Sequence, residues 1–431
     1  MKIQNHIKMI SWSLLDKALF ILYGFIFVLM INYADPVEYA LYSILIAFHT
    51  WIFTISDSFA LQSLIQFGMK SENRRKVNFV ALLNHSILTL GIASLIYIFR
   101  NQILYLFDKP KLENVIYLLP LLTITFIPKA FGQKLIYRDQ KMFQLFITNL
   151  VFFGVNSIYI IYLIYLKKNL NFQDLALSYI YSSATSSIIT IFLTRKELIF
   201  GVVGDIKIKE IFMFNWKMTV GSLLYAVPRQ MDTIILTAFF NLNIIGIYSA
   251  AKTLFRVFDE ALNALAALLY PSAVKHVNNN NDYELETLIT KTFSVGFFTF
   301  FFIYVTLFFG GSGLIEDLPI IPDKYKLAIN YFNILIISLP VLPFTAIYLI
   351  NIAKGRIYEY FLITTIGVIA FFITSFIVGF NHYEHLISLG LLSFYLTEGI
   401  IGFFYSKKLL NIKYSSIFRV FKDVKNYLKR K

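Results

Sequence analysis

Residues 77–99 read VNFVALLNHSILTLGIASLIYIF, an apolar run without one charged side chain. About 20 apolar residues in a helix cross the hydrocarbon core of a bilayer, so this run is long enough to span a membrane. The basic residues Arg74, Arg75 and Lys76 stand directly before it, and such residues gather where membrane helices meet the cytoplasm. The run therefore predicts a transmembrane helix.

The composition extends this prediction to the whole chain. Of 431 residues, 58% are hydrophobic and only 15% are charged, against about 25% charged in a typical soluble domain. These values exclude an ordinary cytosolic enzyme and a disordered chain. The chain has no Cys, which excludes disulfides, thiolate metal sites and cysteine nucleophiles.

Apolar stretches of helical length recur along the chain and are separated by charge clusters or by Asn, Pro and Gly. They predict an all-α integral membrane protein with about twelve transmembrane helices. The predicted spans are 11–32, 39–66, 77–99, 112–133, 142–166, 175–194, 218–239, 245–270, 287–309, 327–350, 358–380 and 386–405.

The distribution of Lys and Arg predicts the orientation. Alternate connections, with the two ends of the chain, hold 27 basic residues on one side and 7 on the other. Cytoplasmic loops retain positive charge, so both termini are predicted to be cytoplasmic. The net charge of +14 is thus assigned to loops beside anionic inner-leaflet lipids, and nucleic acid is not expected as a partner.

The chain is predicted to consist of two similar halves. Tyr42-Ser43 aligns with Tyr248-Ser249, and a basic loop lies at the midpoint. Six crossings return a chain to the same side, so the halves would run parallel with a cleft between them. The predicted parts are six-helix bundles at 1–199 and 218–405, a cytoplasmic linker at 200–217 and a basic amphipathic tail at 406–431.

Short motifs in both halves resemble a known family. Asp35 to Ser43, followed by Ile55-Ser56-Asp57 and Gln62 to Gly68, resembles the first helical hairpin of polysaccharide transporters, the bacterial flippases of lipid-linked oligosaccharides. Gly246 to Lys252, following Asp232, is similar to the family's eighth helix. The chain departs from the pattern at Asp35 and Ala40, where glycines are common.

The resemblance implies the fold of the multidrug/oligosaccharidyl-lipid/polysaccharide exporter superfamily, with two six-helix bundles around a central cavity and alternating access. It implies a polyprenyl-diphosphate-linked oligosaccharide of O-antigen or capsule type as substrate, and the bacterial inner membrane as location. A polysaccharide polymerase and glycosyltransferases are the partners it suggests. No cofactor is expected beyond a proton or sodium gradient.

Five basic residues lie within the predicted spans, where each needs a partner, water or a route to the interface. Lys17 and Lys129 are close to predicted cytoplasmic ends, so their side chains are expected to extend to the interface. Such cations supply charge-assisted hydrogen bonds to phosphate oxygens. The predicted substrate-binding residues are Arg229, Lys252, Arg256, Lys17 and Lys129.

Acidic side chains within the spans are candidates for ion coupling, because a carboxylate in a low-dielectric cavity can bind and release a cation. These candidates are Asp57, Asp232, Asp16, Asp259 and Glu398. Lys252, Arg256, Asp259 and Asn263 share one helix face. The alternative for these charges is a structural network that pairs Arg256 with Asp259 or Glu260 and Arg229 with Asp232.

Other functions remain open from the sequence. An ion-coupled multidrug antiporter of the same superfamily is the closest rival. A polytopic polymerase or acyltransferase would need a larger outer loop or a His/Asp/Glu cluster, and the six histidines are dispersed. No Walker A sequence is present, which excludes ATP hydrolysis by such a motif. Pro120, Pro128, Pro228, Pro340 and Pro343 are expected to interrupt helices, as hinges or as static kinks.

Overall fold

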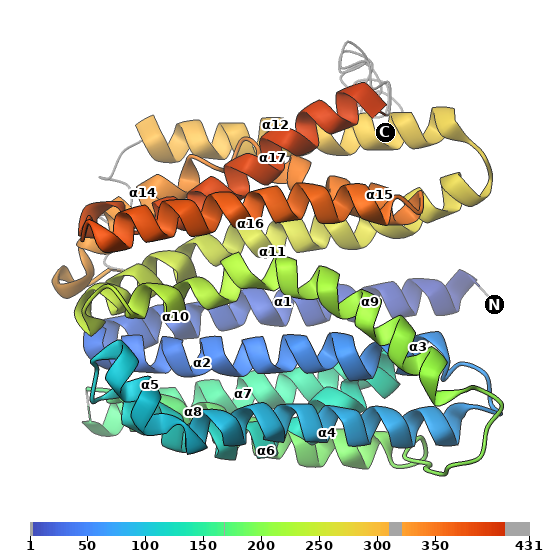
Figure 1. Ribbon diagram of the computed structural model, residues 1–431, viewed down its shortest axis with the longest axis horizontal. Helices are drawn as coiled ribbons and strands as arrows, with labels where there is room; N and C mark the ends of the chain where they lie inside the picture. Colours follow the sequence, from blue (N-terminus) through green and yellow to red (C-terminus); the bar gives the residue numbers. More distant parts are fainter. Residues whose placement is uncertain (1–2, 168, 310–320, 410–431) are drawn as a thin grey trace. The chain divides into compact units, whose positions relative to one another are not determined.

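The computed structural model describes residues 3–167, 169–309 and 321–409, and the described residues are overwhelmingly helical (Figure 1). Each of the twelve predicted spans is helical over most of its length. The predicted basic tail lies outside the described residues beyond residue 409. The all-α membrane fold predicted from composition and apolar period is confirmed.

The chain divides into two compact units, residues 1–250 with 322–325, and residues 251–321 with 326–431. Unit 1 contains α1 (Ile3–Tyr33), α2 (Pro36–Ser56), η1 (Asp57–Leu61), α3 (Gln62–Gln66), α4 (Arg74–Ile98), α5 (Arg100–Phe107), α6 (Leu112–Arg138), α7 (Met142–Lys167), α8 (Phe172–Thr194), α9 (Ile208–Ala226), η2 (Val227–Met231), α10 (Asp232–Thr237), the start of α11 (Leu242–Asn278) and η3 (Asp323–Tyr325).

Unit 2 contains the rest of α11 and the helices that follow it. These are α12 (Asp282–Phe309), α14 (Leu327–Ile336), η4 (Leu342–Ala346), α15 (Ile347–Ala353), α16 (Ile357–Phe380), η5 (Glu384–Leu386) and α17 (Leu389–Leu409). The division of the chain into two six-helix halves, with a linker at 200–217, stays a prediction.

Nine helices among the described residues are long and apolar enough to cross a membrane. The three other predicted spans fail this test for local reasons. The middle of α11 carries Lys252, Arg256 and two acids. The span at 218–239 carries Arg229, Gln230 and Asp232, and the span at 327–350 is broken between α14 and α15. Polar groups or broken backbone therefore enter the apolar zone in these three segments.

The prolines differ in their effect on the helices. Pro120 and Pro128 lie inside α6, which continues from Leu112 to Arg138 without the expected interruption, whereas Pro228 lies in the π-helical segment η2. Pro343 lies in the 3₁₀ turn η4, between the two halves of a broken span. Their proposed role as hinges stays a prediction.

Helix α6 packs against α2, α4, α7 and α8 within unit 1. Figure 1 shows α2, α4 and α6 running side by side. Leu61 and Leu64, Val77 and Ala81, and Phe131 and Leu135 meet in one buried cluster. One face of α6 is therefore enclosed by other helices, while Leu121 and Ile124 lie on its exposed face.

Gly246 explains one of the resemblance motifs. A Cβ atom at this position would lie 1.8 Å from the backbone oxygen of Pro36. The starts of α2 and α11, which are the two segments aligned by the internal repeat, therefore approach each other through a glycine that no larger residue can replace. The repeat-related residue, Ala40, is fully buried.

Candidate functional site

Two one-turn π-helical segments, η1 and η2, mark the polar region of unit 1. π-Helical turns are rare and often occur at functional sites. η2 packs against α2, and η1 packs against α9. Thr54, one turn before η1, donates a hydrogen bond from Oγ1 to Oε1 of Gln230 in η2 at 3.2 Å. The two interrupted helices are thus joined by a polar contact.

Asp57 begins η1 and is held by two neighbours. Nζ of Lys134 lies 2.9 Å from its Oδ1, and Nε2 of Gln62 donates to its Oδ2 at 2.8 Å. The Asp57 side chain is 34% exposed. The predicted span 112–133 ends before Lys134, but Lys134 lies inside α6. The predicted ion-coupling carboxylate therefore has a basic partner that sequence reasoning missed.

Arg229 lies in η2, and its guanidinium carbon is 4.4 Å from the ring centroid of Tyr225. A guanidinium stacked on an aromatic face carries its hydrogen-bond donors at its edge. The end of α9 and the π-helical turn thus place an aromatic ring and an arginine against each other. Phosphate and sugar groups are the chemistry that such a pair recognises.

Asp232 is fully buried. It accepts a hydrogen bond from the hydroxyl of Tyr248 and from the backbone N–H of Thr233 at 2.7 Å. These donors stabilise the carboxylate and join α10 to the start of α11. The observed contacts are those of a carboxylate that holds two helices together.

Lys129 is buried in the middle of unit 1, with 4% of its surface exposed. Its Nζ lies 3.3 Å from the centroid of the Phe152 ring and 4.9 Å from that of Phe126. The expectation that this side chain extends to the interface is wrong, because Lys129 lies on the face of α6 that is packed against α7 and α8. Lys17, in contrast, is exposed on α1.

The backbone of α6 is contacted by a hydroxyl beside Lys129. Oγ of Ser187 accepts from the Lys129 N–H at 3.1 Å and donates to the carbonyl of Thr125 at 2.6 Å. A hydroxyl from α8 thus bonds both a donor and an acceptor that are four residues apart on α6. Pro128 precedes Lys129 and has no N–H to give.

Asp16, also buried, belongs to a chain of amide contacts. Nδ2 of Asn149 donates to its Oδ1 at 2.7 Å, and Nε2 of Gln133 donates to Oδ1 of Asn149 at 2.8 Å. Asp16 is close enough to act electrostatically on Lys129. Helices α1, α6 and α7 are thereby linked through one acid and two amides.

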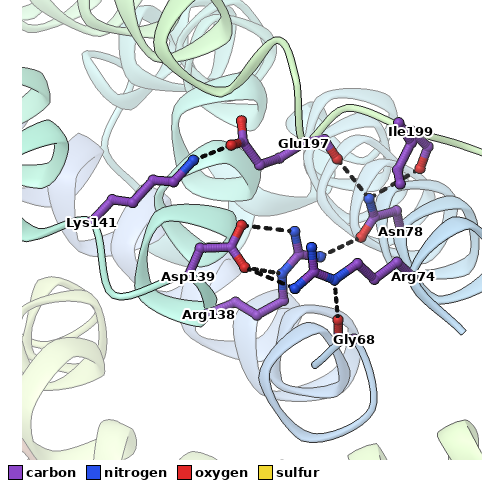
Figure 2. Close-up of polar contacts among 8 residues, drawn as sticks. All are labelled: Gly68, Arg74, Asn78, Arg138, Asp139, Lys141, Glu197 and Ile199. Carbon is purple, nitrogen blue, oxygen red and sulfur yellow. Dashed lines mark hydrogen bonds and ion pairs between the residues drawn. The ribbon is translucent and has the colours of Figure 1, made fainter. Parts of the chain in front are cut away.

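A second polar region lies at the end of unit 1 where α6 meets α7 (Figure 2). Arg138 donates to both carboxylate oxygens of Asp139, at 3.0 and 3.2 Å, and to Oδ1 of Asn78 at 2.9 Å. Arg74 lies 3.5 Å from Asp139. A pocket of about 520 Å³ is lined by Met69, Arg74, Arg138, Asp139, Gln140, Lys141, Lys196, Glu197 and Ile199.

The pocket fixes the segment that follows α8. Asn78 donates from Nδ2 to the carbonyls of Glu197 and Ile199, at 2.9 and 3.0 Å, and Lys141 pairs with Glu197. Arg74, Arg138 and Lys141 are thus engaged by acids, an amide or a carbonyl of the same unit. We assign this region to structure, as the contact that holds the start of the 195–207 segment on unit 1.

A small cluster of contacts surrounds Asp35, which directly precedes α2. Nζ of Lys324 lies 3.4 Å from its Oδ1, and the Tyr325 hydroxyl donates to the carbonyl of Ala34 at 3.2 Å. Burial, with the neighbouring Tyr39 and Asp35, raises the pKa of Tyr325. The tyrosine therefore stays a neutral donor, and η3 is fixed to unit 1.

In unit 2, the polar stripe of α11 is divided between two kinds of contact. Arg256 lies 3.9 Å from Glu260. Asp259 accepts a hydrogen bond from the hydroxyl of Tyr395, at 3.0 and 3.1 Å from its two oxygens. Of the two pairings weighed for Arg256, the structure shows the ion pair with Glu260. Sequence reasoning did not find Tyr395, which lies 136 residues from Asp259.

Glu398 is buried on α17, one turn after Tyr395. Lys252 is half-buried on α11, and Arg256 is exposed. Among the described residues, no group of three or more His, Asp and Glu side chains is arranged to hold a metal ion. The described basic side chains are suited to binding anions. The described carboxylates are suited to binding and releasing cations, and a lysine amine is suited to binding and releasing a proton.

The fold defines the class of protein. It matches an inward-facing multidrug resistance transporter of the MATE family of the MOP superfamily over 92% of this chain and 94% of the other, with TM-score 0.72 and 12% identity. It matches the lipid II flippase MurJ, in an inward closed conformation, over 96% and 92%, with TM-score 0.67 and 14% identity. A MOP superfamily transporter from Pyrococcus furiosus matches over 94% and 95%, with TM-score 0.60 and 13% identity. The chain is a multi-pass membrane protein with the MOP fold.

A family model described as polysaccharide biosynthesis protein matches residues 34–318, and the chain belongs to this family. The resemblance inferred from Asp35 to Ser43 and from Gly246 to Lys252 is confirmed, and both motifs lie inside the matched region. No curated protein matches the chain by sequence.

Proposed function

We propose that this protein flips polyprenyl-diphosphate-linked oligosaccharides from the inner to the outer leaflet of the bacterial inner membrane. Membership of the polysaccharide biosynthesis family is the observation that carries the proposal. The MOP fold supports it, since a lipid II flippase shares that fold. Substrates of O-antigen or capsule type fit the family description.

Arg229 is our candidate for contact with the diphosphate. It lies on a π-helical turn, half-buried, against Tyr225. A guanidinium binds two phosphate oxygens at once, whereas an ammonium acts as a point charge. The aromatic ring beside it supplies a face for a sugar. Lys252, Arg256, Lys17 and Lys129 stay predictions as substrate-binding residues.

The proposal is tested by deleting the gene in its host and measuring lipid-linked repeat units on each side of the inner membrane. Build-up on the inner leaflet with loss of surface polysaccharide is expected. Unchanged surface polysaccharide and no build-up would sink the proposal. Neighbouring genes for a polymerase and glycosyltransferases would identify the glycan, and both termini are expected on the cytoplasmic side in tagging experiments.

Arg229→Lys and Arg229→Ala separate binding from folding. Both should reduce export at unchanged abundance, with the lysine variant intermediate, because it keeps the charge and loses the planar fork. Arg195→Ala provides a control, since this exposed arginine lies over Phe192 outside the π-helical region. Equal export by all three variants would remove Arg229 from the proposed site.

Multidrug antiport is the second candidate. The likeness to a MATE fold and the carboxylates Asp259 and Glu398 in unit 2 favour it, since acids attract cationic drugs. Deletion would then lower resistance to cationic drugs and leave surface polysaccharide intact. The two deletion phenotypes do not overlap, so one strain decides between the candidates.

A further inference from the structure

The interior of unit 1 holds ionisable side chains from three helices. Asp16 of α1, His49 of α2 and Lys129 of α6 are all buried. The Lys129 ammonium position is bordered by the rings of Phe126 and Phe152. Among the described residues, no hydrogen bond or ion pair reaches its Nζ. A structural lysine at this depth would be expected to pair directly with an acid.

His49 adjoins this lysine. Its ring lies 4.6 Å from the ring of Phe126, which also faces Lys129, and Lys129 acts electrostatically on it. Nδ1 of His49 is buried without a hydrogen-bond partner among the described residues. Positive charge on one of the two bases opposes positive charge on the other, so their protonation is coupled.

The elements around this pair contribute one acid and no other nearby cation. Asp16 is the acid that acts on Lys129. The only charged residues of α7 and α8 are Lys167 and Asp174, which pair with each other. On the remaining neighbours, His85 of α4 is bonded to Ser56, and Asp57 of η1 is paired with Lys134.

The backbone beside Lys129 is contacted from another helix. Ser187 of α8 accepts from the Lys129 N–H and donates to the Thr125 carbonyl. Pro128, directly before Lys129, has no N–H to give to the backbone hydrogen bonds of α6. The side chain that would sense a proton is therefore attached to a segment of α6 where the helical hydrogen bonding is weakened.

We propose that Lys129, together with His49 and Asp16, is the proton-binding site that couples transport to a proton gradient. The lone pair of Nζ takes up one proton from water on one side of the membrane and gives it to water on the other. Asp16 compensates the ammonium, and His49 exchanges the proton with it. This assignment rests on the proposed function only for what the proton drives; proton binding itself does not require the glycan.

The test uses the full-length protein in proteoliposomes on a solid-supported membrane, with no glycan present. A step in external pH should produce a transient charge displacement in the wild type. Lys129→Met should reduce it to the level of protein-free vesicles, because the site is gone. Lys129→Arg should do the same while keeping the positive charge, because arginine does not release its proton. Lys209→Met, at an exposed lysine of α9, should leave the displacement intact.

Retention of the full displacement by Lys129→Met or Lys129→Arg would overturn the proposal. A wild type that responds to a sodium step and not to a pH step would also overturn it. Size-exclusion profiles report folding; where Lys129→Met fails to fold, Lys129→Arg decides. Failure of the proposed function is seen separately, as unchanged surface polysaccharide after gene deletion, and it would leave the proton signal in place.

Discussion

The two units treat charge in the membrane differently. Unit 1 buries Lys129 and Arg138 together with the acids Asp16 and Asp232. Among the described residues of unit 2, Glu398 is the charged side chain that is fully buried, and the cations of α11 lie half-buried or exposed. In unit 1, charged side chains are enclosed by groups from several helices. In unit 2, the charged side chains of α11 lie along one less buried helix face. The comparison shows two ways in which an apolar bundle accommodates charge.

The largest difference in stability between variants of the two units is expected at glycines where helices cross closely. Gly246→Ala would place a carbon 1.8 Å from the Pro36 oxygen in unit 1, whereas Gly402→Ala would place one 2.5 Å from the Phe344 oxygen in unit 2. We expect Gly246→Ala to destabilise by at least about 3 kcal/mol, and Gly402→Ala by less, since overpacking usually costs about 1–3 kcal/mol. Unfolding in detergent measures both.

Gly154→Ala is the control for this comparison, because a Cβ there has no neighbour within 4 Å. Its free energy of unfolding should not fall, since alanine favours a helix over glycine. Equal stability of the three alanine variants would contradict the close crossing.

Removal of an acid should distinguish buried from open charge. Asp139→Ala leaves the buried Arg138 without its carboxylate, and loss of one partner of a buried pair costs about 3 kcal/mol. Glu260→Ala removes the partner of exposed Arg256, and exposed pairs contribute less than about 1 kcal/mol. Chemical unfolding of the two variants in one detergent gives the comparison. A larger loss for Glu260→Ala would reverse the distinction between the units.

In unit 2, the hydroxyl of buried Tyr395 donates a hydrogen bond to Asp259 on another helix. Tyr395→Phe keeps the ring and removes the donor to Asp259, so we expect a loss of about 1.5–3 kcal/mol, as for hydrogen bonds to charged groups. Tyr358→Phe, at a side chain that is 74% exposed, should change stability little. Matching thermal melts of these two variants would show that unit 2 does not depend on this contact.

The smallest effect is expected at the contact of Ser187 with α6. Ser187→Ala removes the hydroxyl that bonds the Lys129 N–H and the Thr125 carbonyl, at a cost of about 1 kcal/mol. Ser157→Ala is the control, since its hydroxyl bonds Phe153 four residues earlier in α7. Hydrogen exchange at the Lys129 amide should become faster without the hydroxyl, and unchanged exchange would contradict the contact.

Much of the fold followed from local pattern, and the site followed only in part. The length and hydrophobicity of the apolar runs predicted the helical segments, because lipid imposes both requirements on each helix independently. The same reasoning placed Lys134 in a loop and let Lys129 reach the interface, because sequence counts the distance to a helix end and not which neighbours surround it. The contact of Asp259 with Tyr395 joins distant helices, so no spacing rule could reveal it.

The sequence by itself determined the medium, the number of apolar segments, the motifs of the family and the residue types that carry charge into the bilayer. The tertiary structure decided which of those charges are enclosed by other helices, where π-helical turns replace regular ones, and which hydroxyl contacts the backbone of α6. The physical reason is that transfer into lipid is fixed residue by residue along a helix, whereas compensation of a buried charge depends on groups that only packing brings together.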